Sequence, residues 1–397
     1  MLPSFDDIGG VTSMAKFLLR GIRQRGDMDV RIVSLATSRR DPLSVLVSRP
    51  STWFRGVRTA RAQAHGEEYV RVGAFLGEIE LFRLKPRGAL RNLFADCDLV
   101  QLVAGAPSWI CTLSDVQKPI VAYVATMVDI ERRRPLSLAT GLSGKWRKFM
   151  TDFAVRMDYD GLKVADEVFV MNTWMQRHCS EHTIKGIDNV HYGPPGVDST
   201  TFTPLAERTP SRSYILSIGR LSDERKNAAL LLNAYSKAAA AKSDLPDLVL
   251  AGAGDMPDWF WQRVRQFGLE GRVRHIPNPS IAALADIYRN AQCFVMSSDE
   301  EGFGIVVIEA MASGIPVIAT RCGGPEDVVA DGVNGYLVDR DDADAMADRM
   351  IRLASDVHLN LKMGAEALNT VQARFTSEAA FRPYSEIYDR MLAQLAR

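Results

Sequence analysis

Two glutamates, Glu301 and Glu309, lie eight residues apart around a glycine-rich turn. The apolar segment 291–298 (AQCFVMSS) is typical of a buried parallel strand, and IVVIEAMAS after Gly304 predicts a helix that ends at Gly314. Such a turn leaves backbone N–H groups unpaired at a helix start, where the helix dipole favours an anion. Two carboxylates beside an anion site would repel the anion, so they suit a ligand whose hydroxyl groups donate hydrogen bonds to them. The pattern therefore predicts a ligand that carries both phosphate and hydroxyl groups.

A single glutamate at a helix start is often only a capping or dipole partner, but the pair with its turn weakens that alternative. The stretch 300–320 (EEGFGIVVIEAMASGIPVIAT) closely resembles the signature of retaining glycosyltransferases of family 4. The resemblance implies the GT-B fold and a nucleotide-sugar donor. It assigns Glu301 to the hydroxyls of the donor sugar and Glu309 to the ribose. The turn between them, which also binds the donor, consists of Gly302, Phe303 and Gly304.

A second motif, residues 219–227 (GRLSDERKN), follows a predicted strand. Arg220 and Lys226 bracket a loop that opens a helix, a suitable place for two cations to hold a diphosphate. A surface loop with three basic residues is also commonplace, so a solvated loop is the alternative. The segment is similar to the family's GR-L…K-N pattern, and this resemblance assigns Arg220 and Lys226 to the departing diphosphate. Arg225 receives no role.

Two glycine pairs complete the expected donor site. Gly252 and Gly254 end a predicted strand, as a turn near a nucleotide would, although the residues after them break the dinucleotide fingerprint. Gly9 and Gly10 at a helix start resemble the family's first strand-to-helix turn. Only MLPSFDDI precedes this turn, so we expect either that the natural product begins upstream or that the first strand is short.

The N-terminal half departs from the family pattern at one position. Many members carry a histidine, which contacts the donor sugar, at the end of the strand that corresponds to residues 119–126 (PIVAYVAT). None of the six histidines of this chain falls there. The nearest polar candidates for contacts with the donor or acceptor are Thr126, Asp129, Glu131 and Arg132.

These motifs need rigid elements to position them, and strands alternate with helices in both halves of the chain. This predicts an α/β fold of two doubly wound Rossmann-like domains that face each other across a cleft, as in GT-B enzymes. The glycine- and proline-rich segment 191–202 is typical of a linker. We therefore predict an N-terminal acceptor-binding domain over 1–188 and a C-terminal nucleotide-sugar domain over 189–376. A final helix, about 377–397, returns to the first domain; the weakly periodic segment 42–91 predicts loops and insertions.

Composition and charge indicate where in the cell the protein acts and which surfaces it contacts. No apolar run is long enough to span a bilayer, and no signal peptide is evident. Five widely spaced cysteines suit a reducing cytoplasm and argue against a zinc site. Residues 1–150 contain 23 Lys and Arg against 14 Asp and Glu, and the basic, aromatic segment 145–150 (KWRKFM) is typical of membrane interfaces. We expect a cytoplasmic protein that binds peripherally to the inner face of an anionic membrane. The alternative is a basic surface that is merely solvated. Nucleic acid is not expected as a partner, because no recognisable nucleic-acid-binding module accompanies the positive charge.

The resemblance also implies a mechanism. A hexosyltransferase of this type moves the sugar from a nucleotide diphosphate sugar to a hydroxyl of a sugar or lipid-linked acceptor, in glycan, polysaccharide or glycolipid assembly, with anomeric retention. The departing phosphate accepts the proton, so no cofactor, metal or dedicated base is expected. The alternatives are a nucleotide-binding dehydrogenase, a catalytically inactive GT-B subunit that binds a nucleotide, a partner or a membrane, and, more distantly, a sugar-nucleotide epimerase.

Overall fold

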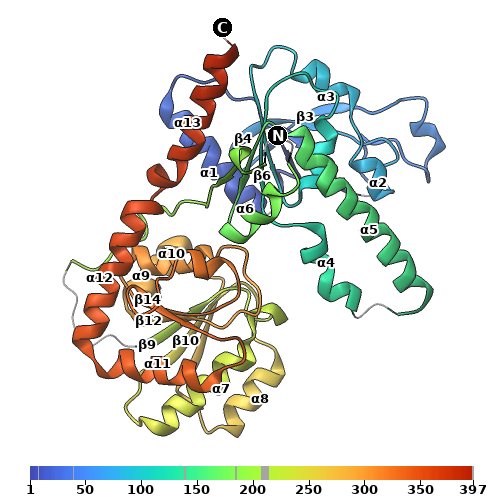
Figure 1. Cartoon of the computed structure of the whole chain (residues 1–397). Helices are drawn as coiled ribbons and strands as arrows, with labels where there is room; N and C mark the ends of the chain where they lie inside the picture. The colour runs from blue at the N-terminus through green and yellow to red at the C-terminus, as the bar shows by residue number, and fades with distance from the viewer. Residues whose placement is uncertain (8, 39, 138–139, 184–185, 207–213, 396–397) are drawn as a thin grey trace. The chain divides into compact units, whose positions relative to one another are not determined.

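The computed structural model describes residues 1–397 apart from 8, 39, 138–139, 184–185, 207–213 and 396–397, and the chain divides into two compact units (Figure 1). Unit 1 comprises Met1–Pro194 and Phe381–Arg397, and unit 2 comprises Pro195–Ala380. We predicted the first boundary at 188/189. The contacts place it between Pro194 and Pro195, inside the predicted linker.

Unit 2 is built on a six-stranded sheet whose neighbouring strands are all parallel. The strand order is β11-β10-β9-β12-β13-β14. In chain order within the unit this is 3-2-1-4-5-6, the Rossmann arrangement, and its direction reverses between β9 and β12. The strands are β9 (Tyr214–Ile218), β10 (Asp247–Gly252), β11 (Val273–Pro277), β12 (Ala291–Met296), β13 (Val317–Thr320) and β14 (Gly335–Val338).

Helices cover both faces of this sheet (Figure 1). Apolar side chains of α7, α8 and α11 form one core with the strands, in which Leu231, Tyr235 and Phe260 are fully buried. On the other face, α10 packs against α12. The helices are α7 (Ala228–Ala241), α8 (Asp258–Gln266), α9 (Ile281–Arg289), α10 (Ile305–Ala312), α11 (Ala343–Ser355) and α12 (Val357–Arg374). The predicted doubly wound architecture is confirmed in this unit.

Unit 1 contains two four-stranded sheets, ordered β1-β2-β4-β3 and β5-β6-β7-β8. Hydrogen bonds from the Met1 amino group to Gln101 O (2.6 Å) and from Val103 N to Met1 O (2.9 Å) join β1 to β5, so the first strand is central. This strand is only two residues long. The strands are β1 (Leu2–Pro3), β2 (Val33–Leu35), β3 (Thr59–Ala64), β4 (Glu67–Val72), β5 (Val100–Ala104), β6 (Ile120–Val124), β7 (Glu167–Val170) and β8 (Val190–Tyr192).

The segment 42–91 differs from our expectation of loops, because it contains an antiparallel hairpin formed by β3 and β4. His65 and Gly66, with φ of 55° and 79°, form its two-residue turn. The apolar residues of β3 are all alanines, which have a low preference for strands, and the strand is largely exposed, so its signal in the sequence is weak. The sheet formed by β1 to β4 is therefore not entirely parallel, whereas β5 to β8 are all parallel.

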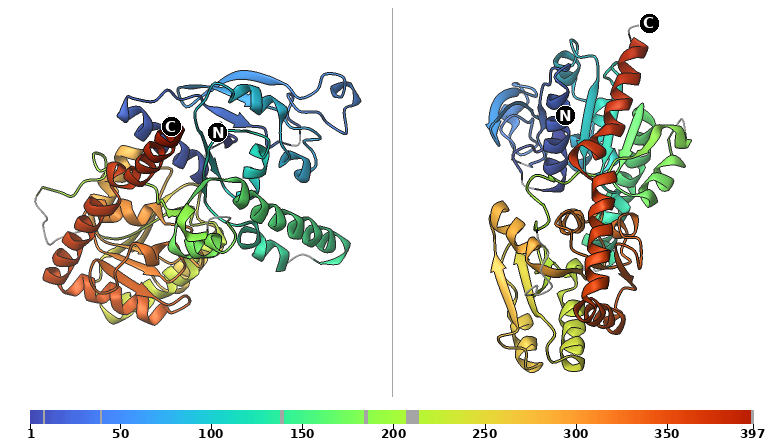
Figure 2. Two further views of the ribbon diagram at one scale, coloured as in Figure 1. Left: turned by 45° about the horizontal axis from the view of Figure 1, so that its top comes forward. Right: turned by 90° about the vertical axis from the view of Figure 1, so that its left-hand side faces the viewer.

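The helices of unit 1 include two that lie side by side, α4 and α5, and extend beyond the sheet (Figures 1 and 2). The carboxylate of Asp158 on α5 accepts hydrogen bonds from Val128 N at the start of α4 (2.7 Å) and from Ser108 N (2.8 Å). The helices are α1 (Gly10–Arg25), α2 (Glu80–Arg83), α3 (Gly88–Leu93), α4 (Val128–Ser137), α5 (Gly141–Val164) and α6 (Thr173–Ser180). Within the described residues, no helix combines the length and the apolar character that crossing a membrane requires.

The last helix is α13 (Ser377–Leu395), and its residues from Phe381 onward belong to unit 1. The ring of Tyr384 stacks on Phe169 with centroids 3.9 Å apart, and its hydroxyl donates to Gly193 O at 2.7 Å. Phe381 fills the space over Gly21, where a Cβ atom would come within 2.4 Å of its ring. These contacts bury the apolar face of α13 in the core of unit 1.

Candidate functional site

The carboxyl ends of β9 and β12 carry the two motifs that we predicted from the sequence. In an open parallel sheet, ligands bind outside these ends at the point where the strand order reverses, and β9 and β12 are the strands on either side of that point. The loop 219–227 follows β9, and the loop 297–304 follows β12. The sheet therefore brings side chains about 75 residues apart in the chain to one place.

Hydrogen bonds fix these two loops to each other. Asp299 N donates to Arg225 O at 2.8 Å, and Ser297 Oγ donates to Lys226 O at 2.8 Å. The Asn227 side chain donates to Asp299 Oδ1 at 2.7 Å and caps α7 by accepting from its third residue. Asn227 adopts the left-handed conformation (φ 45°), which asparagine tolerates better than most residues. Its role was not predicted, although the K-N pair of the motif was a sufficient signal.

Lys226 and Glu301 form an ion pair, with both side chains about one-fifth exposed. Arg220 is exposed, and no hydrogen bond or ion pair to its side chain is found in the part of the chain that the structure describes. Arg225 is different, because its guanidinium forms an ion pair at 2.8 Å with Asp223, two residues earlier in the chain. The site thus presents two cations, one of which is held by a carboxylate that can also accept from a hydroxyl.

The backbone holds Glu301 firmly in place. Its N–H donates to Cys322 O (3.1 Å), and its carbonyl accepts from Gly324 N (2.8 Å), so it is tied to the loop after β13. Gly304 lies at the N-cap of α10 with φ 85°, a conformation that favours glycine. Phe303 is buried and its ring lies 5.8 Å from that of Phe375. The turn therefore presents the start of α10 and the Glu301 carboxylate on a rigid frame.

Glu309 lies in α10, one helical turn and a half beyond Gly304, and its carboxyl group is almost fully desolvated. Burial raises the pKa of this carboxyl to about 7, and a hydrogen bond from the Tyr288 hydroxyl (2.8 Å) offsets only part of that effect. Tyr288 is itself fully buried, and burial raises its pKa well above 10. No local pattern predicts this partner, because Tyr288 belongs to α9 and lies 21 residues from Glu309.

Gly252 and Gly254 lie at the end of β10, beside the loop after β9. A Cβ atom on Gly252 would lie 2.0 Å from Gly219 O, and its φ is 142°, so both space and conformation require glycine. Gly254 N donates to the side chain of Asn278 at 3.3 Å. This close approach of two backbones fixes the path of the chain that leads to Arg220.

The predicted residues of the N-terminal half belong to unit 1. Gly9 and Gly10 begin α1, and no atom lies within 4 Å of a Cβ built on either of them, so the start of this helix is open. Thr126 follows β6, and Asp129 and Glu131 lie in the first turn of α4. Arg132 differs from these, since it is in an ion pair with Glu80 and lines a pocket.

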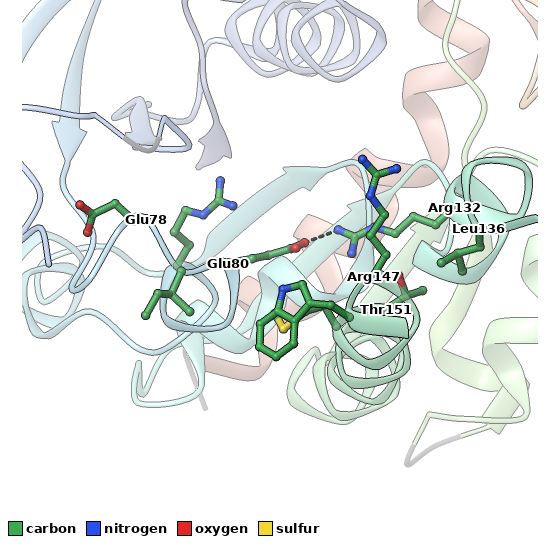
Figure 3. Close-up of a pocket in the computed structure, with 10 residues that line it drawn as sticks. Glu78, Glu80, Arg132, Leu136, Arg147 and Thr151 are labelled. Atoms are coloured by element: carbon green, nitrogen blue, oxygen red, sulfur yellow. Dashed lines mark hydrogen bonds and ion pairs between the residues drawn. The ribbon is translucent and has the colours of Figure 1, made fainter. Parts of the chain in front are cut away.

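That pocket has a volume of about 630 Å³ and lies between the segment around α2 and the helices α4 and α5 (Figure 3). Among its members, only Arg132 was predicted to contact the donor or the acceptor, while Trp146, Arg147 and Met150 belong to the segment 145–150 that we predicted as a membrane contact. Three short segments of the chain supply the lining, and none of them carries a motif that indicates a pocket. The lining residues are Glu78, Ile79, Glu80, Arg83, Arg132, Leu136, Trp146, Arg147, Met150 and Thr151.

Residues 206–370 match the family Glycosyl transferases group 1. A D-inositol 3-phosphate glycosyltransferase of Corynebacterium aurimucosum is 30% identical over 239 residues, which are 56% of each chain. An N-acetyl-alpha-D-glucosaminyl L-malate synthase of Bacillus anthracis is 34% identical over 144 residues, 36% of this chain and 37% of that protein. The alignments thus span about half the length of the first of these relatives and less of the second.

Solved structures extend the likeness to nearly the whole chain. Sucrose-phosphate synthase from Thermosynechococcus elongatus superposes with a TM-score of 0.72 at 19% identity, over 99% of this chain and 98% of that one. Anabaena Alr3699/HepE in complex with UDP gives 0.70 at 14% identity, over 98% of both chains. The fold is therefore GT-B, with two Rossmann-like units, as predicted.

Proposed function

We propose that the protein is a retaining glycosyltransferase that moves a hexosyl group from a nucleotide diphosphate sugar to an acceptor hydroxyl. The observation that carries the proposal is the ion pair of Lys226 with Glu301 at the reversal point of a Rossmann sheet. Arg220 lies on the same loop as Lys226, and Glu309 lies in the helix that follows Glu301. Guanidinium and ammonium groups suit a diphosphate, and carboxylates suit sugar hydroxyls. The names of the similar proteins support the same class of reaction.

Each of these residues has a distinct part in the proposed reaction. The bond between the anomeric carbon and the diphosphate breaks, a bond to the acceptor oxygen forms on the same face, and the acceptor's proton passes to the departing phosphate. Negative charge grows on the diphosphate, where Arg220, Lys226 and the start of α10 stabilise it. Glu301 orients the sugar, and Glu309 accepts from the ribose; neither attacks the sugar. No metal or cofactor takes part.

The donor turn and the glycine pairs complete this proposal. The backbone of Gly302, Phe303 and Gly304 and the turn at Gly252 and Gly254 approach the nucleotide. The open start of α1 at Gly9 and Gly10 lies in unit 1, and we assign it to the phosphates as well. Thr126, Asp129, Glu131 and Arg132 remain candidates for the sugar or the acceptor. The donor sugar enters glycan, polysaccharide or glycolipid assembly.

A panel of UDP-, GDP- and ADP-sugars tests the reaction. We expect one donor to raise the melting temperature and to release nucleotide in the presence of an acceptor, because a ligand that binds only the folded state stabilises it. NMR of the product should show the anomeric configuration of the donor. An inverted product contradicts retention, and nucleotide binding without release from any donor favours an inactive subunit.

The α5 helix supports a peripheral membrane contact. The side chains of Trp146 and Phe149 are 63% and 61% exposed, and Lys145 and Lys148 beside them are exposed as well. Aromatic and basic residues on one helix surface are typical of segments that bind an anionic membrane, each basic residue contributing about 1 kcal/mol. We place this contact at the cytoplasmic face. Co-sedimentation with anionic but not neutral vesicles, reduced by Phe149→Ser, tests it; equal binding to both kinds of vesicle contradicts it.

A further inference from the structure

The pocket of unit 1 has the size and the lining of a ligand site. Its volume of about 630 Å³ falls within the range of small-molecule sites, roughly 300–1,000 Å³. One part of its wall is apolar (Ile79, Leu136, Trp146 and Met150), and the other part is charged. Trp146 offers a flat surface with one polar atom, which suits the apolar face of a sugar ring.

The charged part of the wall carries an excess of positive charge. The wall contains three arginines, Arg83, Arg132 and Arg147, but only two acidic residues, Glu78 and Glu80. Figure 3 shows the side chain of Glu80 directed at Arg132, with which it forms an ion pair, and Glu78 away from that pair.

The carboxylate of Glu78 already accepts hydrogen bonds from groups outside the pocket. It accepts from Val47 N (2.5 Å), from Ser48 N (2.9 Å) and from the Ser48 hydroxyl. Partial desolvation acts to raise the pKa of Glu78, but these hydrogen bonds outweigh it and the pKa is lowered. Glu78 therefore stays charged while its oxygens face the backbone of the 47–48 segment, and it offers little to a cation in the pocket.

Arg147 is the cation that remains available. It is exposed on α5, and no carboxylate or hydrogen-bond acceptor for its side chain is found among the residues that the structure describes. Arg83 is held differently, because its Nη1 donates to Thr37 O at 2.5 Å. One guanidinium group can donate two parallel hydrogen bonds to two oxygens of the same phosphate, whereas a lysine ammonium group acts as a point charge.

We propose that this pocket binds the phosphate group of the acceptor, with Arg147 and Arg132 on the phosphate and Trp146 against the attached ring or chain. The inference rests on the proposed function, since it names the class of acceptor as a phosphorylated one. Glu80 then acts as a competitor of the phosphate for Arg132. The phosphate belongs either to a soluble sugar phosphate or to a lipid phosphate.

Binding of simple phosphates without any donor tests the pocket itself. The probes are inorganic phosphate and glucose 6-phosphate for a soluble acceptor and dodecyl phosphate for a lipid one, measured by calorimetry at constant ionic strength. We expect Arg147→Gln to weaken binding about tenfold, because one charge-assisted hydrogen-bonding group is lost. The control Arg156→Gln removes an exposed arginine of the same helix that does not line the pocket, and it should leave binding unchanged.

Glu80→Gln separates a ligand site from a structural cluster. Removing the competing carboxylate frees Arg132, so we expect phosphate to bind several times more tightly, whereas loss of a purely structural ion pair would not improve binding. Equal binding by Arg147→Gln and Arg156→Gln, or weaker binding by Glu80→Gln, overturns the proposal. Tighter binding of glucose 6-phosphate than of dodecyl phosphate indicates a soluble acceptor, and the reverse order indicates a lipid.

The outcome does not depend on the donor reaction. Phosphate binding that requires Arg147, in a protein that turns over no donor, supports the pocket and contradicts the proposed function. Turnover of a donor with no effect of Arg147→Gln on phosphate binding supports the function and contradicts the pocket.

Discussion

At the scale of single residues, the site at the reversal point of unit 2 is defined by carboxyl groups in contrasting surroundings. Glu301 pairs with Lys226, whereas Glu309 is buried against the neutral hydroxyl of Tyr288. A donor would exchange the first contact for a phosphate on Lys226 and a sugar hydroxyl on Glu301. Burial without a cation gives Glu309 a pKa of about 7, so its charge changes near neutral pH.

This titration affects stability. The ordinary pKa of a glutamate is 4.5, so between about pH 4.5 and 7 the folded protein retains a proton on Glu309 that the unfolded chain has released. The stabilisation is complete at low pH and disappears as pH rises through 7. Relative to the native chain, Glu309→Gln should therefore gain about 2–3 kcal/mol in free energy of unfolding from pH 5 to pH 8.

Urea denaturation of the native chain and the variant at both pH values measures that gain. The exposed Glu270 of the same unit provides the control, and Glu270→Gln should show no comparable change between the two pH values. A pH-independent difference between Glu309→Gln and the native chain would show that Glu309 keeps its charge in the folded protein.

The same titration bears on ligand binding. If the ribose hydroxyls donate to a Glu309 carboxylate, the nucleotide binds the deprotonated form better, and its affinity rises as pH increases through about 7. We expect the dissociation constant of the preferred nucleoside diphosphate to fall several-fold from pH 6 to pH 8. This change should be absent in Glu309→Gln; an identical pH profile in the variant contradicts the ribose contact.

At the scale of elements, the approach of β10 to the loop after β9 sets the path to Arg220. Gly252→Ala would place a Cβ 2.0 Å from Gly219 O at a φ of 142°. The control Gly268→Ala also has positive φ (65°), but no atom lies within 4 Å of its Cβ. We expect the control to lose about 1 kcal/mol of stability and Gly252→Ala clearly more, together with its affinity for the nucleotide. Equal losses of stability in the two variants would show that the loop after β9 moves to make room for the Cβ atom.

The pairing of α4 with α5 depends on Asp158. Burial raises the pKa of its carboxyl to about 6, while its two backbone hydrogen bonds act in the opposite direction. Asp158→Ala leaves two buried N–H groups without an acceptor, and we expect a loss of about 2–4 kcal/mol in urea denaturation. The exposed Asp152 on the same helix is the matched control, and Asp152→Ala should be nearly neutral. A similar small loss in both variants would contradict the anchoring role.

At the scale of the whole molecule, the sequence predicted most of unit 2 because strand, turn and helix each carry a local signal there. The segment VIAT is β13 as predicted, and the helix before it ends next to Gly314. The hairpin β3–β4 and the pocket of unit 1 were not predicted. The first is polar and exposed, and the second is assembled from segments that only the tertiary fold brings together.

The candidate site shows the same limit. Lys226 and Glu301 were each selected as site residues from their motifs. Their ion pair was not predicted, because the order of the strands in the sheet, and not the spacing in the sequence, decides which loops meet. Tyr288 illustrates this further, since no local pattern links it to Glu309.

The last helix contributes to the stability of unit 1 through Tyr384. Tyr384→Ala removes the stacking on Phe169 and the hydrogen bond to Gly193 O, and leaves a cavity. We expect a loss of about 3–5 kcal/mol in the unfolding of unit 1, as for other buried aromatic residues. Gln394→Ala, exposed near the end of the same helix, should have no measurable effect. A loss below 1 kcal/mol for Tyr384→Ala would mean that α13 is dispensable.

The most direct test of the central claim is the rate of nucleotide release by Lys226→Ala, compared with Lys237→Ala. Lys237 is half-exposed on α7 and pairs with Asp344 away from the site. With the preferred nucleotide sugar, we expect Lys226→Ala to lower kcat about 10²–10³-fold, because a group that stabilises charge in the transition state is lost. Lys237→Ala should match the native chain. Native turnover by Lys226→Ala would contradict a diphosphate site at the junction of β9 and β12.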